Sequence, residues 1–172
     1  GLLLLADLLL RSRNLRAFYT DAGVLPRSTL VTGGNPLHPS VHLAFGDVWG
    51  QALLFAVAGA FALALTIGYR TTLATAGSWL LLVSLHNRMP GVLNGGDVLL
   101  RLLLFWALFL PLGAYWSVDS RQGERGPDAV ASVASAALLC QVVLMYATNA
   151  ALKSAGEYWV AGTGIQYAFS LE

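Results

Sequence analysis

Four long stretches without a charged residue constrain the fold of this chain more than any other feature. They run over Val48–Tyr69, Thr71–Asn87, Leu102–Val118 and Ala129–Leu152. A helix of about 20 residues crosses a hydrocarbon layer of about 30 Å, and each stretch reaches that length once its flanking residues are included. Because a chain in lipid must satisfy its own backbone hydrogen bonds, these stretches are expected to be membrane helices.

The composition agrees with a membrane protein. Only 11% of the residues are charged and 56% are hydrophobic, whereas soluble domains carry about 25% charged residues. The net charge of +1 gives no basic field for a nucleic acid, so we expect membrane lipid and no nucleic acid as a partner. Cys140 is the one cysteine, which excludes an internal disulfide or a thiolate metal cluster.

The opening residues "GLLLLADLLL" resemble the second half of a spanning helix rather than a signal peptide, so we expect an excerpt of a longer protein. With this segment the chain has about five membrane helices. The predicted fold is all-α, a polytopic transmembrane helix bundle over residues 1–172, and the predicted location is integral to the membrane with several passes.

The predicted connections differ in length. Arg70–Thr72 gives a tight turn, so the helices on either side should form an antiparallel hairpin. The segment Arg11–Asp47 is long, rich in proline and glycine, and has few helical signals, which is typical of functional loops. The uncharged stretch Tyr158–Leu171 is short and polar, so we interpret it as a loop or an interfacial helix.

Counting crossings places the ionisable residues closest to membrane depth on one face. This face holds the long loop together with His86, Asn87, Arg88, Asn94, Asp97, Arg101, Lys153 and Glu157. The opposite face receives Arg70, Tyr115, Trp116, Asp119, Arg121 and Arg125. Charges near membrane depth are costly and mark functional sites. The excess of loop arginines on the first face favours a cytoplasmic position for it.

Lys153 is the only lysine, and the other nine basic residues are arginines. It follows 24 uncharged residues, so one interpretation is a helix-end anchor whose charge lies at the lipid headgroups. The other interpretation is a catalytic base. Poor solvation favours the neutral amine of a lysine, which can accept a proton, whereas arginine stays charged.

His86 lies in "SLHNRMPGVLNGGD", close to Asn87, Arg88 and Asp97. A histidine at a helix end can be a hydrogen-bonded structural residue or part of a site. Asp97 and Arg101 are four residues apart and are expected to pair, while Asp97 could also cap the helix that follows it.

His38 and His42 are also four residues apart, a spacing that can bind a metal ion on a helix. Pro39 between them fits only the first turn of a helix, and no further ligand pattern accompanies them. We therefore expect no metal site.

Three stretches together resemble the HTTM family, the membrane domain shared with vitamin K-dependent gamma-carboxylases. They are "FYTDAGVLPR", "SLHNRMPGVLNGGDVLLRLLLFWALFLPLGAYWSVDS" and "ALKSAGEYWVAGTGIQYA", and the resemblance spans most of the chain, from residue 18 to residue 168. The resemblance implies a partial HTTM domain. It also implies quinol-dependent carboxylation of glutamate in a protein substrate, with a reduced naphthoquinone of the vitamin K type as cofactor and O2 and CO2 as co-substrates.

The resemblance also implies roles for named residues. The family lysine falls in the segment that matches "ALKSAGEYW", which makes Lys153 the expected base. The "LHNR" element lies near the quinone site in the family, which makes His86 the second catalytic candidate. Asn87, Arg88, Asp97 and Arg101 would then form the supporting quinone-binding shell.

Two other functions stay open. The first is a non-enzymatic module that binds quinone or lipid, or serves in assembly, in which Lys153 only anchors a helix. The second is a transporter fragment, which would need a polar path past mid-membrane toward Tyr115 and Asp119. An enzyme instead needs Lys153 and His86 at one concave, partly apolar pocket.

Overall fold

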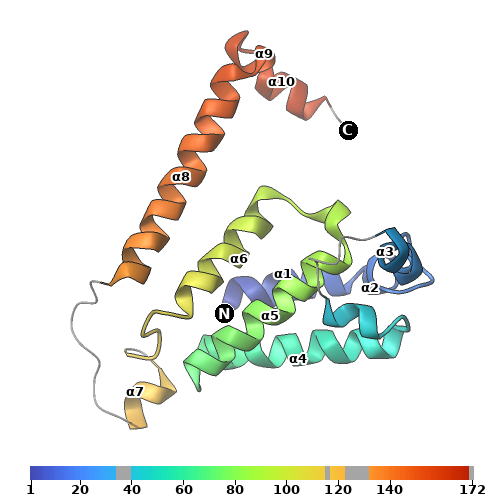
Figure 1. The fold of residues 1–172 in the computed structure, drawn as a ribbon, viewed down its shortest axis with the longest axis vertical. Coiled ribbons are helices and arrows are strands. Elements are labelled where there is room, and N and C mark those ends of the chain that lie inside the picture. Colours follow the sequence, from blue (N-terminus) through green and yellow to red (C-terminus); the bar gives the residue numbers. More distant parts are fainter. Residues whose placement is uncertain (34–39, 115–116, 123–131, 171–172) are drawn as a thin grey trace. The chain divides into compact units, whose positions relative to one another are not determined.

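The computed structural model describes residues 1–33, 40–114, 117–122 and 132–170, and every regular element within these ranges is a helix (Figure 1). The all-α prediction is therefore confirmed. The chain divides into two compact units, Gly1–Val130 and Ala131–Glu172, within what the sequence suggests is one domain.

An antiparallel helix pair forms the centre of the first unit. It consists of α4 (Val48–Ile67) and α5 (Thr71–Arg88), which pack along each other. Gly68 ends α4 in the left-handed conformation, with φ of 73°, and a side chain there would collide with Ser117. The hairpin predicted at Arg70–Thr72 is confirmed.

The hairpin is completed by α1 (Leu2–Ser12), which packs on α4, and α6 (Gly95–Ala107), which packs on α5. Each of the four helices places one residue in the same buried cluster, and these residues are Leu4, Ala62, Leu82 and Leu104. A second cluster forms where α2 (Leu15–Tyr19) meets the hairpin. Its buried members are Tyr19, Phe55, Leu85 and Met89.

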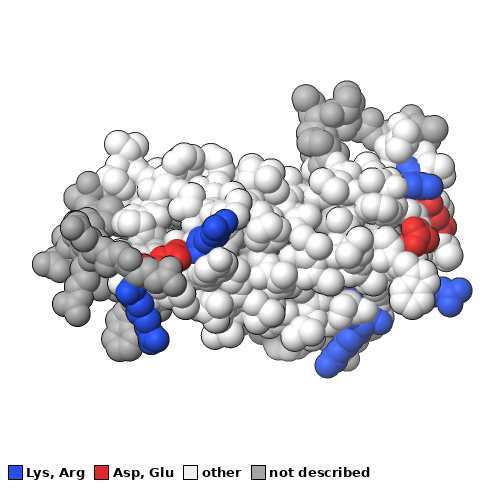
Figure 2. Space-filling model, turned by 90° about the horizontal axis from the view of Figure 1, so that it is seen from below, with Lys and Arg blue, Asp and Glu red and all other residues white. Residues whose placement is uncertain are grey.

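Large apolar side chains cover much of the outside of α4. Leu53, Leu63 and Ile67 are each more than half exposed. Figure 2 shows a wide uncharged surface on this side, with charged side chains gathered toward its two ends. Such a surface is costly in water and is expected where lipid covers the protein.

Among the described residues, two helices are long and apolar enough to cross a membrane, α4 and α8 (Val133–Ala155). The predicted span Leu102–Val118 is not one continuous helix, because α6 ends at Ala107. At 1.5 Å per residue its 13 residues reach about 20 Å, less than the ~30 Å of a hydrocarbon core. Pro111 disfavours a helical residue before it and offers no N–H, which explains the early end.

The segment predicted as an irregular loop contains short helices. These are α2, α3 (Arg27–Gly33) and the 3-10 helix η1 (Val41–Ala44). The described part of the segment folds back on the hairpin, with α2 against α4 and η1 against α5. Proline and glycine suggested irregular backbone, but contacts with the hairpin stabilise α2 and η1, which local sequence does not predict.

The second unit consists of α8 followed by α9 (Glu157–Val160) and α10 (Gly164–Phe169). A capping box between Ser132 and Ser135 begins α8. None of the residues of α8 is buried. Its apolar surface thus needs lipid or protein beyond this unit. The stretch Tyr158–Leu171, predicted as a loop or an interfacial helix, thus contains helical turns, and their position at a membrane interface stays a prediction.

Candidate functional site

Buried polar side chains gather at the end of the hairpin where α5 finishes. The N-terminal end of α6, the C-terminal end of α1 and the segment that follows α1 all reach this end. At the opposite end of the hairpin, the Asp119 carboxylate accepts the backbone N–H groups of Arg70 and Thr71, each at 2.9 Å. Asp119 of α7 (Val118–Gln122) therefore caps the start of α5.

Arg11 is the centre of an ion network at the first of these ends. Its Nε lies 2.9 Å from the Asp7 carboxylate one turn earlier, and its Nη2 lies 2.6 Å from Oδ1 of Asp97. Its Nη1 donates to the Tyr19 hydroxyl at 3.3 Å. Burial raises the pKa of Tyr19, although the Arg11 guanidinium opposes this rise. The network joins α1, α2 and α6.

This network corrects the predicted pairing of Asp97 with Arg101. Within the described residues the ion partner of Asp97 is Arg11, which sequence reasoning did not assign to the site. The four-residue spacing of Asp7 and Arg11 was the available signal. The predicted cap by Asp97 of a helix that follows it is also corrected. Helix α6 begins at Gly95 with Asn94 as its N-cap, and Asp97 in the first turn accepts a hydrogen bond from the Asn94 N–H at 2.9 Å.

His86 lies beside this network in the last turn of α5 and is 1% exposed. The charges that act on its ring belong to Arg11, Asp97, Arg101 and Asp7. Neither ring nitrogen has a hydrogen-bond partner among the described residues. A buried imidazole without a partner is costly, so a group that donates to or accepts from this ring would stabilise the site.

Arg88 lies two residues after His86, at the end of α5, and is fully buried, with 0% exposure. Its Nη1 donates to the carbonyl of Leu25 at 2.8 Å, and its Nη2 lies 3.8 Å from the carboxylate of Asp21. Because His86 and Arg88 are two residues apart on a helix, they point in different directions. Asn87 and Arg101, the other two predicted shell residues, are half-buried on α5 and α6.

Lys153, the predicted base, lies in the last turn of α8 in the second unit and is exposed. Its Nζ is 4.5 Å from the centre of the Trp159 ring, a cation–π contact. That Lys153 shares a face with His86 stays a prediction.

His42 is a second buried polar residue. The sequence analysis considered it only as a possible metal ligand. Its Nδ1 lies 2.7 Å from the Ser84 hydroxyl, and the Gln51 amide donates to its carbonyl at 2.7 Å. Burial, and secondarily the charge of Arg88, lower the pKa of His42 to about 4. His38 lies outside the described residues. Within the part of the chain that the structure describes, no group of three potential ligands could hold a metal ion.

A small pocket lies between the hairpin and α1, beside His42. Its lining is apolar apart from His42 and the Ser78 hydroxyl, which has no hydrogen-bond partner among the described residues. The enclosed space of about 10 Å³ is the size that one water molecule needs. It is far too small for a two-ring quinone.

Comparisons with protein-family models, with characterised proteins and with solved structures gave no significant match.

Proposed function

We propose that this chain is a partial HTTM-type membrane domain that acts on a reduced naphthoquinone in a carboxylase-like reaction. The single observation that carries this proposal is the buried His86 ring with two nitrogens lacking partners among the described residues, beside the Arg11–Asp97 ion pair. The resemblance in "LHNR" and "ALKSAGEYW" supplies the reaction class. Helices α4 and α8 support the membrane location.

The chemistry of His86 fits a quinol hydroxyl. A neutral imidazole carries one N–H donor and one acceptor nitrogen, and a hydroxyl group both donates and accepts. His86 would therefore orient the hydroxyl, while Arg11 and Asp97 fix the helices around it. When bound, a quinol would supply the reducing equivalents for O2 and, through that reaction, a base strong enough to take a gamma proton from glutamate.

Lys153 would accept the hydroxyl proton in this proposal. Its amine must first leave the Trp159 ring and lose its own proton, because only the neutral amine is a base. Asn87, Asp97 and Arg101 support the site around His86, and CO2 would add to the glutamate carbanion.

The second candidate is a non-enzymatic membrane module that binds quinone or lipid. The exposed Lys153 stacked on Trp159 favours it, because lysine and tryptophan both concentrate where a helix meets the headgroups. A transporter fragment is less favoured. Asp119, which a polar path would use, has both carboxylate oxygens engaged by the backbone of Arg70 and Thr71. Tyr115 lies outside the described residues.

Turnover in lipid nanodiscs tests the proposal. The chain would receive a reduced 2-methyl-3-alkyl naphthoquinone, O2, radiolabelled CO2 and a glutamate peptide, and quinone epoxide and labelled peptide would be measured. We expect both products from the wild type. We expect Lys153→Arg, which keeps the charge and the ring contact but cannot act as a base, to lower both at least 100-fold. Full activity of Lys153→Arg would exclude a lysine base.

The second variant in this assay is His86→Gln. Glutamine can donate and accept hydrogen bonds, so a purely orienting His86 should be partly replaced, with a higher KM and a smaller change in kcat. Arg13→Gln, an exposed change in the same unit, is the control. Absence of both products in the wild type, with the quinol still bound, would favour the non-enzymatic module.

A further inference from the structure

The guanidinium of Arg88 has one hydrogen-bonded side and one side without such a partner. Nη1 donates to the Leu25 carbonyl, whereas Nε and Nη2 have no hydrogen-bond partner among the described residues. Nε and Nη2 together form the edge of an arginine that binds a carboxylate through two parallel hydrogen bonds. This edge belongs to a side chain with 0% exposure, so it has little access to bulk water.

Asp21 is the acid nearest to this edge, but other groups hold its carboxylate. Its Oδ1 accepts the backbone N–H of Arg27 at 2.9 Å, and its Oδ2 pairs with Arg27 Nε at 2.9 Å. Oδ2 also lies against Gly46, where a side chain would approach it to 1.8 Å. Asp21 therefore stays 3.8 Å from Nη2 of Arg88, beyond hydrogen-bond range.

The three ionised side chains around the Nε–Nη2 edge of Arg88 have a net charge of +1. Arg27 and Arg88 contribute two positive charges and Asp21 contributes one negative charge. One carboxylate would neutralise the group. A dianionic phosphate would reverse its charge, so the balance favours a monoanion.

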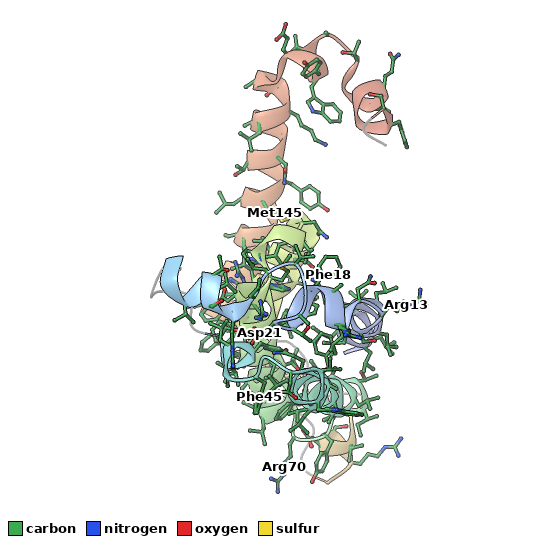
Figure 3. All side chains as sticks on the ribbon, turned by 90° about the vertical axis from the view of Figure 1, so that its right-hand side faces the viewer. Arg13, Phe18, Asp21, Phe45, Arg70 and Met145 are labelled. Carbon is green, nitrogen blue, oxygen red and sulfur yellow. The ribbon has the colours of Figure 1, made fainter. Side chains whose placement is uncertain are left out.

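The surroundings indicate the rest of the ligand. Leu25, whose carbonyl accepts from Arg88, and Met89, the next residue in the chain, both belong to the apolar cluster around Tyr19. Asp21, labelled in Figure 3, has a side chain that is 36% exposed, and the side chain of Arg27 is 43% exposed. The open edge of Arg88 thus lies one side chain below the surface, next to apolar groups.

We propose that the Nε–Nη2 edge of Arg88 binds the carboxylate of an amphiphilic monocarboxylate, a fatty-acid-like molecule whose apolar body packs near Leu25 and Met89. The carboxylate makes two charge-assisted hydrogen bonds to this edge, and Asp21 stays on Arg27. This inference does not depend on quinol chemistry at His86, because the two side chains point away from each other.

The test is a titration of the nanodisc-embedded chain with octanoate carrying ¹³C at its carboxyl carbon, without quinol or O2. We expect a saturable carboxyl shift that empty nanodiscs lack. Octanamide, which is neutral, should not compete, and acetate and octyl phosphate should compete at least tenfold more weakly. Equal competition by acetate would overturn the apolar-body claim, and stronger competition by octyl phosphate would overturn the carboxylate claim.

Two variants assign the shift to Arg88. Arg88→Lys keeps a positive charge but loses the two-pronged edge, so octanoate affinity should fall at least tenfold. Asp21→Asn removes the neighbouring negative charge, so affinity should rise several-fold. Arg13→Lys, at an exposed position in the same unit, should change nothing.

The two variants still test octanoate binding at Arg88 if one of them folds poorly. Helix content and thermal unfolding are measured for each, and Asp21→Asn alone distinguishes a binding edge from a structural one, since only a binding edge gains affinity. An octanoate shift that both variants leave unchanged would overturn the proposal.

Discussion

The two long apolar helices, α4 and α8, pass the same length and composition test for a membrane span but have different surroundings. Helix α4 buries six of its residues, among them Gln51, in the first unit. Helix α8 buries none within the described residues. The comparison shows that apolar length alone does not locate function. In this chain the buried polar groups accompany the helix that is packed, and the exposed Lys153 accompanies the helix that is not.

The sharpest way to test this contrast is to remove the centre of the buried ion network. Arg11→Met leaves the carboxylates of Asp7 and Asp97 without their cation, and Asp97 is 6% exposed. We expect the free energy of unfolding of the first unit to fall by about 3–5 kcal/mol, because an uncompensated buried charge is costly. Lys153→Met in the second unit should change it by less than about 0.5 kcal/mol. Denaturant unfolding in mixed micelles measures both, and similar small effects would contradict the network.

Acid should act on the first unit through His42. Its folded pKa of about 4 lies below the ordinary value of 6.5, so unfolding is coupled to proton uptake between these values. The contribution of the neutral His42 ring to the free energy of unfolding is fully present above pH 6.5 and is lost as the pH falls toward 4. By linkage this contribution amounts to about 3 kcal/mol.

His42→Gln should make the pH profile less steep by the contribution of His42, while the buried His86, whose pKa burial also lowers to about 4, keeps its own contribution. Residues 131–172 contain no histidine, so the second unit offers a reference for the same titration. Unfolding curves at pH 7, 5.5 and 4 check this. A wild-type profile as flat as that of His42→Gln would show that His42 is not buried as a neutral ring.

Matched leucine truncations compare the packing of the two regions. Leu82 is 4% exposed in the cluster shared by four helices, and Leu144 on α8 is 65% exposed. We expect Leu82→Ala to cost about 2–3 kcal/mol through the cavity it leaves, and Leu144→Ala to cost less than about 0.5 kcal/mol. Thermal unfolding followed by circular dichroism measures both. Equal losses would mean that α8 is packed as tightly as the hairpin.

The smallest expected effect concerns the far end of the hairpin. The backbone N–H groups of Thr71 and Arg70 hold the pKa of the Asp119 carboxyl below its usual value of 3.8. The cap is therefore fully effective above pH 3.8 and weakens as the pH falls below it. Amide hydrogen exchange at the start of α5 should speed up in acid, and Asp119→Asn should remove this pH dependence. Unchanged exchange in the wild type would contradict the cap.

Parts of this structure could be predicted from local sequence. The uncharged runs predicted α4, α5 and α8, and Arg70–Thr72 predicted the hairpin, because these depend on helical length and turn chemistry. The end of α6 at Ala107 was missed, although Pro111 signals it. The short helix α2 depends on its contacts with α4 and has no strong local signal.

The candidate site was predictable only in part. Sequence singled out His86, Arg88 and Asp97 as polar residues next to apolar runs, and all three are buried at one end of the hairpin. Arg11 was missed as the partner of Asp97 because the two are 86 residues apart, and only the packing of α1 near α6 joins them. The Nε–Nη2 edge of Arg88 lacks a hydrogen-bond partner among the described residues because Asp21 pairs with Arg27, and no spacing in the sequence predicts that ion pair.

We propose Lys153 as the base of a quinol reaction, and labelling of this residue, the only lysine in the sequence, tests that role most directly. The rate at which an amine reagent modifies Lys153 would be measured in nanodiscs, anaerobically, with and without a reduced 2-methyl-3-alkyl naphthoquinone. We expect at least tenfold protection by the quinol in the wild type and none in His86→Ala. A rate indifferent to the quinol in the wild type would contradict the claim and leave Lys153 as a helix anchor beside Trp159.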